Sequence, residues 1–175
     1  MVRRAERIRF HGIERDAQGA MDVPEWGGKM NMPDVNAAVG LVQLTRLDAF
    51  NRRRRELALG YIEKLPRHPA VTLPADVPGH SWHMFCVCVD FTALGTSRPA
   101  FQERLQSLGV GSGVHYPAMH LFSLYRKFGY KPGDFPAAER IGEQTLTLPL
   151  FPDMTGDDLD RVCGALQQVL DGGAS

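Results

Sequence analysis

The sequence predicts an α/β fold with a small α+β domain, in which a long helix on the N-terminal side precedes a small sheet with helices packed on one face. One observation is a helical pattern of apolar residues from Pro33 to Leu65. Another is the alternation of strand-like and helix-like segments over about 95 residues after Pro78. The chain of 175 residues is long enough for one globular domain or a small domain with an appendage.

The region before Pro66 is expected to hold two helices joined by a loop. Residues 1–15 are typical of the end of a basic helix that runs into a His-Gly turn, and residues 16–32 lack periodicity and predict a loop. Pro33 suits a first helical turn, and Asp34 suits the positive end of the helix dipole. The second helix would be about 50 Å long at ~1.5 Å per residue. Helices of that length commonly bridge two lobes or lie along a dimer interface.

The region after Pro78 alternates between two kinds of segment. Strands are predicted at "WHMFCVCVDF", "VGSGVHY" and "TLTLPLF", and helices at "RPAFQERLQSLGV", "LFSLYRKF", "FPAAERIGEQ" and "TGDDLDRVCGALQQVL". Thr155 is expected to cap the last helix, with Asp158 near the capping-box position.

Composition excludes several classes of protein. Lys and Arg total 20, as do Asp and Glu, so no net charge attracts nucleic acid or an anionic membrane. No apolar run approaches the roughly 20 residues of a membrane span, and no apolar signal core follows the charged start. The three cysteines, an odd number without framework spacing, indicate reduced thiols and a cytoplasmic location.

Histidines suggest a metal site, but their spacing does not favour one. His80 and His83 would point to opposite faces of a strand, and no carboxylate accompanies these two, His115 or His120 in a ligand-like cluster. Scattered hydrogen-bonding histidines are therefore the favoured interpretation. The sequence also lacks a G-x-S-x-G elbow, a P-loop and a G-x-G-x-x-G fingerprint.

Two short stretches invite a binding role. "GGKMNMPD" places a lysine and an asparagine before a helix N-terminus, which fits an anion site, although a plain turn and helix start is the favoured explanation of the residues alone. "GVHYPAMHLFSLYRKFGY" gathers two histidines, three tyrosines and two phenylalanines. Those rings would form a core, a metal site, or one wall of a pocket for a ring-shaped ligand.

The ordered set of segments resembles the DegT/StrS-type, fold-type I, PLP-dependent sugar aminotransferases. The resemblance is strongest to enzymes that aminate a UDP-linked 4-keto sugar, such as the aminoarabinose-forming type. It rests on "RIRFHG", "GGKMNMPDVNAAVGLVQLTRLDAFNRRRRELALGYIEKL", "SWHMFCVCVD", "LGVGSGVHYPAMHLFSLYR", "GDFPAAERIGEQTLTLPLFPDMT" and "DDLDRVCGAL".

The resemblance implies that the chain corresponds to the C-terminal half of such an enzyme. The family's Schiff-base lysine belongs to a segment upstream of the first residue here, so no catalytic residue is expected and the isolated chain is expected to be inactive. Residues 1–32 would be the end of the large domain with an interface loop, 33–66 an interdomain or dimer helix, and 67–175 the small C-terminal domain.

The resemblance also assigns supporting residues. By position, Lys29 and Asn31 would contact the phosphate of pyridoxal 5'-phosphate, although many relatives carry Asn-x-Arg at Lys29-Met30-Asn31. His115 and Tyr116 would line the nucleotide-sugar pocket. The expected partners are a second copy or a large-domain chain, and the expected reaction moves an amino group from glutamate to a keto-sugar for lipid A, polysaccharide or antibiotic sugars. The alternative is a non-catalytic dimerisation or binding module that complements a full-length homologue.

Overall fold

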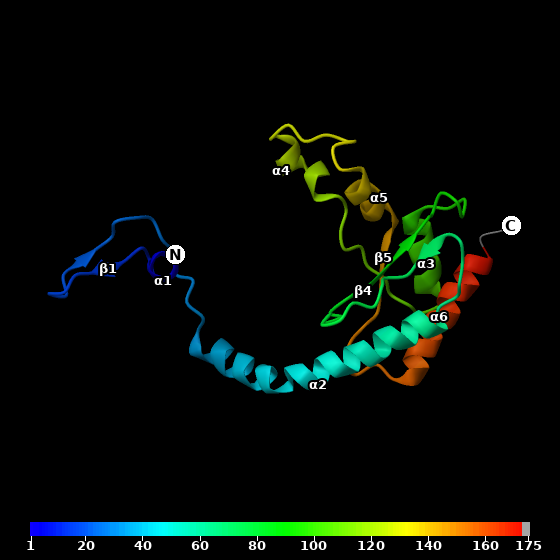
Figure 1. The fold of residues 1–175 in the computed structure, drawn as a ribbon, viewed down its shortest axis with the longest axis horizontal. Coiled ribbons are helices and arrows are strands. Elements are labelled where there is room, and N and C mark those ends of the chain that lie inside the picture. The colour runs from blue at the N-terminus through cyan, green and yellow to red at the C-terminus, as the bar shows by residue number, and fades with distance from the viewer. Residues whose placement is uncertain (173–175) are drawn as a thin grey trace. The chain divides into compact units, whose positions relative to one another are not determined.

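The computed structural model describes residues 1–172, and the chain divides into two compact units, Met1–Leu47 and the part from Asp48 onward. The first unit contains helix α1 (Val2–Arg9) and an antiparallel ribbon of two short strands, β1 (Glu14–Arg15) and β2 (Met21–Asp22) (Figure 1). His11 and Gly12 both have positive φ and reverse the chain after α1. This turn is the His-Gly turn expected from the sequence.

Helix α2 spans Asp34–Lys64, within one residue of the predicted boundaries at each end. Its residues up to Leu47 belong to the first unit, and none of those is buried. The buried positions of the helix, Leu57, Ala58 and Tyr61, all lie in the second unit. Packing against the core therefore stabilises only the C-terminal half of this helix.

The second unit is built on a three-stranded antiparallel sheet in the order β3 (Val71–Thr72), β4 (Phe85–Val89), β5 (Thr145–Leu148). Helix α3 (Arg98–Ser107) follows β4. The 3-10 helix η1 (Met119–Leu121) and the short helices α4 (Ser123–Arg126) and α5 (Pro136–Gln144) precede β5, and α6 (Gly156–Asp171) follows it (Figure 1).

The core lies on one face of this sheet. Alternate residues of β4, namely Phe85, Val87 and Val89, are fully buried, as the period-two pattern of a strand requires. The rest of the cluster comes mainly from the C-terminal half of α2, from α3 and from α6. Helices thus cover one face of the sheet, which confirms the predicted fold class.

Most predicted elements are present, with two corrections. The capping box at Thr155 and Asp158 is confirmed at the start of α6. The strand predicted at residues 110–116 is wrong, because only Gly113 pairs there, as an isolated bridge to Thr147. The strand predicted at residues 82–91 is shorter, because β4 spans only Phe85–Val89, so His83 precedes it, as His80 does. Among residues 1–172, no helix is both long enough and apolar enough to cross a membrane.

Candidate functional site

The loop that carries Lys29 and Asn31 is tied to the end of α1 by main-chain bonds. The amide of Gly28 donates to the carbonyl of Ile8 at 2.9 Å, and the amide of Met30 donates to that of Arg9 at 2.8 Å. His11 in turn donates to the carbonyl of Gly28 at 3.0 Å. The backbone on both sides of Lys29 is therefore fixed before α2 begins.

Two glycines allow this close approach. A Cβ at Gly12 would lie 2.0 Å from the carbonyl oxygen of Glu25, and a Cβ at Gly27 would lie 2.1 Å from the amide nitrogen of Gly12. Both obstacles are backbone atoms, which side-chain rearrangement cannot relieve. Only glycine fits where the loop crosses the turn after α1.

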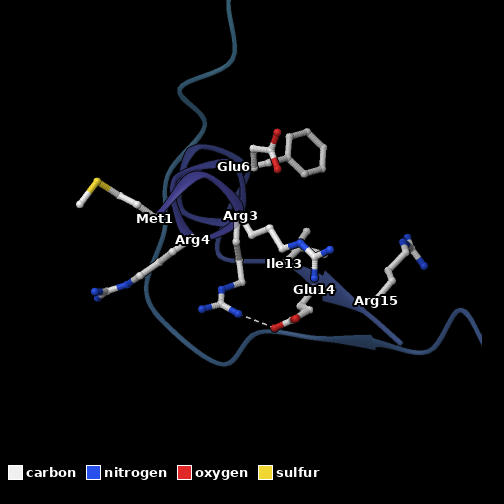
Figure 2. A pocket seen from close by; sticks show the side chains of 9 residues that line it. Met1, Arg3, Arg4, Glu6, Ile13, Glu14 and Arg15 are labelled. Carbon is white, nitrogen blue, oxygen red and sulfur yellow. Dashed lines mark hydrogen bonds and ion pairs between the residues drawn. The ribbon is translucent and has the colours of Figure 1, made fainter. Parts of the chain in front are cut away.

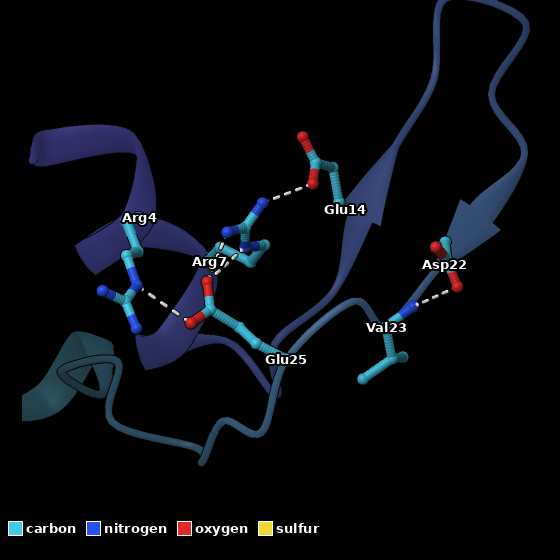
Figure 3. Close-up of polar contacts among 6 residues, drawn as sticks. All are labelled: Arg4, Arg7, Glu14, Asp22, Val23 and Glu25. Carbon is cyan, nitrogen blue, oxygen red and sulfur yellow. Dashed lines mark hydrogen bonds and ion pairs between the residues drawn. The ribbon is translucent and has the colours of Figure 1, made fainter.

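An ion-pair network anchors the same loop. Glu25 accepts hydrogen bonds from Nε of Arg4 and from Nε of Arg7, each at 2.9 Å, and Arg7 also pairs with Glu14 (Figure 3). The hydrogen bonds from Arg7 and then Arg4 hold the pKa of Glu25 below its ordinary value. Figure 3 shows Arg7 between the two carboxylates, so its guanidinium links the loop to β1.

The side chains of Lys29 and Asn31 are both exposed. Within residues 1–172, neither side chain forms a hydrogen bond or ion pair. The loop thus presents an ammonium and an amide just before the N-terminus of the 31-residue helix α2, whose dipole also favours an anion. This donor set fits the phosphate of a cofactor.

A separate pocket of about 610 Å³ lies against α1 and β1. Its charged lining residues include Arg3, Arg4, Glu6, Glu14 and Arg15. Figure 2 shows Arg4 and Arg15 pointing away from each other. The guanidinium groups of Arg4 and Arg15 therefore do not converge on one point of this pocket.

In the second unit, His115 and Tyr116 lie side by side after the bridge at Gly113. Their ring centroids are 4.8 Å apart with nearly perpendicular planes. His115 is half-buried, whereas Tyr116 is 66% exposed. The pair therefore presents one anchored ring and one free ring, which suits a ligand that stacks and accepts hydrogen bonds.

Strand β5 holds His115 in place from two sides. Nδ1 of His115 lies 2.8 Å from Oγ1 of Thr147, and Oγ1 of Thr145 donates to the carbonyl of His115 at 3.3 Å. Sγ of Cys86 on β4 lies 3.2 Å from the same Thr147 oxygen. A line of side-chain contacts thus runs from Cys86 through Thr147 to His115 on the face of the sheet opposite the core.

The second imidazole of the ring-rich stretch has a structural environment. His120 is buried, and its Nε2 lies 2.9 Å from Oε1 of Glu139 on α5. Glu139 also accepts bonds from the amides of Gly133 and Phe135, and the ring of Phe135 packs edge-on to His120. Burial acts to raise the pKa of Glu139, but the bonds from Gly133, His120 and Phe135 outweigh it and lower that pKa.

A smaller pocket of about 340 Å³ adjoins the start of β4. Its lining includes His80, Trp82, His83, Met84 and Cys86. The indole nitrogen of Trp82 is buried without a hydrogen-bond acceptor among the described residues. Within that part of the chain, no group of three His, Cys, Asp or Glu side chains could hold a metal ion.

Sequence reasoning pointed to Lys29, Asn31, His115 and Tyr116 but missed Thr147. The structure pairs His115 with Tyr116 in the second unit, and it holds Lys29 and Asn31 on one loop of the first. The alternation in "TLTL" was a usable signal, because it places the threonines opposite the core leucines. Nothing in the pattern, however, says that the segment at Gly113 lies beside Thr147.

Comparison with known proteins gives a consistent result. The model of the DegT/DnrJ/EryC1/StrS aminotransferase family matches residues 1–167. The aminotransferase TlmJ from Streptoalloteichus hindustanus is similar in structure, with a TM-score of 0.83 and 31% identity over 99% of this chain and 45% of TlmJ.

Two further solved structures resemble the chain. DesV from S. venezuelae has a TM-score of 0.82 and 27% identity over 97% of this chain and 44% of DesV. The PLP form of the sugar aminotransferase Spr1654 from Streptococcus pneumoniae has a TM-score of 0.83 and 24% identity, over 97% of this chain and 43% of Spr1654. The chain spans less than half the length of each of these proteins. With the family model matched along almost its whole length, the chain belongs to the DegT/DnrJ/EryC1/StrS aminotransferase family.

Proposed function

We propose that the chain is the C-terminal portion of a PLP-dependent aminotransferase that moves an amino group from glutamate to a nucleotide-linked keto-sugar. The match to the aminotransferase family over residues 1–167 carries this proposal. The sugar product would serve lipid A modification, surface polysaccharide or antibiotic glycosylation, and a UDP-linked 4-keto sugar is the proposed substrate class. The three free thiols suit a reaction in the cytoplasm.

Lys29 and Asn31 are the proposed contacts to the cofactor phosphate. The ammonium would supply a positive charge and the amide a hydrogen bond, and the anchored backbone between them limits the entropy lost on binding. When bound, PLP supplies an electron sink for the carbon at which the amino group is exchanged. The residues of this loop orient the phosphate and do not take part in the proton transfers.

His115 and Tyr116 are the proposed wall of the nucleotide-sugar pocket. Uridine diphosphate (UDP) titrated calorimetrically into the full chain tests this role. We expect Tyr116→Ala to weaken binding about tenfold, the size expected for a well-placed aromatic contact. The matched control is Tyr130→Ala, which removes another exposed ring. Equal affinity in the two variants would argue against a pocket wall at Tyr116.

The isolated chain is proposed to be inactive, because none of its four lysines has the expected cofactor context. Lys64 pairs with Asp160, which raises its pKa, and the other three are exposed. The test is to incubate the chain with PLP, reduce it with borohydride and map modified peptides. A single stoichiometrically modified lysine would contradict this proposal.

A second function, a dimerisation module that complements a full-length homologue, is favoured by one observation. No residue of α2 up to Leu47 is buried, yet apolar side chains there are widely exposed, including Val35, Leu41, Val42 and Leu44. Such a surface is normally covered by another protein surface. Sedimentation equilibrium of the full chain and of Leu41→Asp tests this function, with Gln43→Glu as the control for added charge. We expect Leu41→Asp alone to shift the chain toward monomer, and an unchanged mass would contradict the dimer.

A further inference from the structure

The hydroxyl of Thr147 meets the thiol of Cys86 and the imidazole of His115 on the face of the sheet opposite the core. The register of β4 and β5 places Cys86 directly across from Thr147. On the other side of β5, Gly113 and Thr147 exchange both main-chain hydrogen bonds, at 3.0 and 2.8 Å. Thr147 is therefore a fixed point between the thiol of Cys86 and the imidazole of His115.

The hydroxyl of Thr147 has one proton to share between two neighbours. It either donates to Nδ1 of His115, or it accepts from a protonated Nδ1 and donates to the sulfur of Cys86. An imidazole nitrogen is a good acceptor, whereas a thiol sulfur is a weak one. The first arrangement also lets the thiol proton of Cys86 bond to the threonine oxygen, so the thiol, the hydroxyl and Nδ1 of His115 each have a hydrogen-bond partner.

We propose that Thr147, supported by Cys86, is a positioning residue that fixes neutral His115 with its proton on Nε2. The consequence of this tautomer concerns Nε2, on the side of the His115 ring away from Thr147. Nε2 has no partner within the described residues, and it is not among their buried unpaired atoms. His115 therefore offers an N–H donor toward solvent, next to the exposed ring of Tyr116.

The fixed tautomer determines what His115 selects in a ligand. An Nε2–H group binds acceptor atoms such as phosphate, carbonyl or sugar oxygens, and it discriminates against a donor presented at the same place. This part of the inference rests on the proposed function, in which a nucleotide-sugar lies against His115 and Tyr116. The tautomer itself rests only on the contacts of Thr147 and Cys86.

Nitrogen-15 spectra of the imidazole rings in the full chain test the tautomer directly, at about pH 8, above the ordinary titration range of histidine. We expect the wild-type His115 signals to be those of an unprotonated Nδ1 and a protonated Nε2. Thr147→Val, which keeps the shape but removes the hydroxyl, should move both signals toward the average of the two tautomers. Thr147→Ser should restore the wild-type pattern.

A matched pair of cysteine variants tests the supporting role of Cys86. Cys86→Ala is expected to shift the His115 signals part of the way, whereas Cys88→Ala, on the same strand face but without a bond to Thr147, should not. The inference is overturned if Thr147→Val leaves the two nitrogen signals unchanged, or if the wild-type ring carries its proton on Nδ1.

Titration of the same samples with uridine diphosphate separates this inference from the proposed function. We expect the wild-type Nε2 signal to shift on binding, and Thr147→Val to bind roughly three- to tenfold more weakly, the range for one neutral hydrogen bond. If the tautomer is fixed but the nitrogen signals of His115 do not shift when UDP is added, the ligand role of His115 is contradicted and the positioning by Thr147 stays supported. If the Nε2 signal shifts with UDP but Thr147→Val leaves the two nitrogen signals unchanged, the ligand role of His115 is supported and the positioning by Thr147 is contradicted.

Discussion

Oε1 of Glu139 lies 2.9 Å from Nε2 of the buried His120 imidazole, and the same oxygen accepts a hydrogen bond from the main-chain amide of Gly133 at 2.8 Å. The pair joins η1 to the first turn of α5, and the Gly133 bond closes the loop between them. One side chain thus holds the segment that follows His115 and Tyr116.

The first prediction concerns the pH dependence of this pair. The pKa of Glu139 is lowered from its ordinary 4.5, so its ionised form stabilises the folded state above that value, and this contribution is lost as the pH falls through the lower folded-state pKa. Glu139→Gln should therefore be less stable at neutral pH, and its unfolding free energy should approach that of the wild type in acid. Urea unfolding at a series of pH values measures the difference.

The control for this prediction lies on the same helix. Glu143→Gln alters an exposed carboxylate of α5 for which the described residues provide no hydrogen bond. Its stability should follow the wild type at every pH. A Glu139→Gln difference that stays constant down to acid pH would show that the carboxylate charge contributes nothing.

The long helix and the last helix were predictable because their signals are local. Apolar spacing and flanking prolines set the ends of α2 to within one residue, and the Thr155–Asp158 capping box depends only on groups three positions apart. Two of the three strands were predictable, since the alternation in β4 and, from Leu146 onward, in β5 matches their burial, whereas the two-residue strand β3 has no such signal. These features need no knowledge of what lies nearby in space.

The candidate site was harder to predict because its contacts join distant segments. Thr147 meets His115 across a 32-residue separation and Cys86 across 61 residues, and no local pattern specifies either contact. The segment at Gly113 looked like a strand, but a single bridge forms there and the chain then turns away with His115. Resemblance pointed to His115 and Tyr116, whereas only the packing of β5 identified the group that holds the imidazole.

The second prediction tests the loop that carries Lys29. Gly27→Ala would place a Cβ 2.1 Å from the Gly12 amide nitrogen, so the loop must move off the turn after α1. Amide hydrogen exchange should become faster at Met30, whose amide bonds to Arg9, and at His11, whose amide bonds to Gly28. Gly28→Ala is the matched control, because its nearest contact is the flexible end of Met30 at 3.1 Å. Equal exchange in both variants would mean that the glycine packing does not position the loop.

The third prediction concerns the buried hydroxyl of Tyr61, which donates to the carbonyl of Pro149 at 2.8 Å. Tyr61→Phe leaves that carbonyl without its donor, and the expected loss in unfolding free energy is about 1–3 kcal/mol. Urea denaturation gives the value directly. Tyr125→Phe removes a hydroxyl that has no bond within the described residues, so its stability should change by less than about 0.5 kcal/mol. A loss in Tyr61→Phe no larger than in this control would refute the role of the bond.

The fourth prediction is that Cys163 is the least reactive of the three thiols. Its side chain is buried against the core, and burial raises its pKa to about 11, so at pH 8 only about 0.1% is thiolate. Cys86 and Cys88 are half-buried on the opposite face of the sheet, and alkylation by iodoacetamide should label their peptide first. In urea all three should react at similar rates, which provides the control for intrinsic reactivity. Equal labelling of the folded chain would mean that α6 opens faster than the reagent reacts, and that the core around Cys163 is not closed.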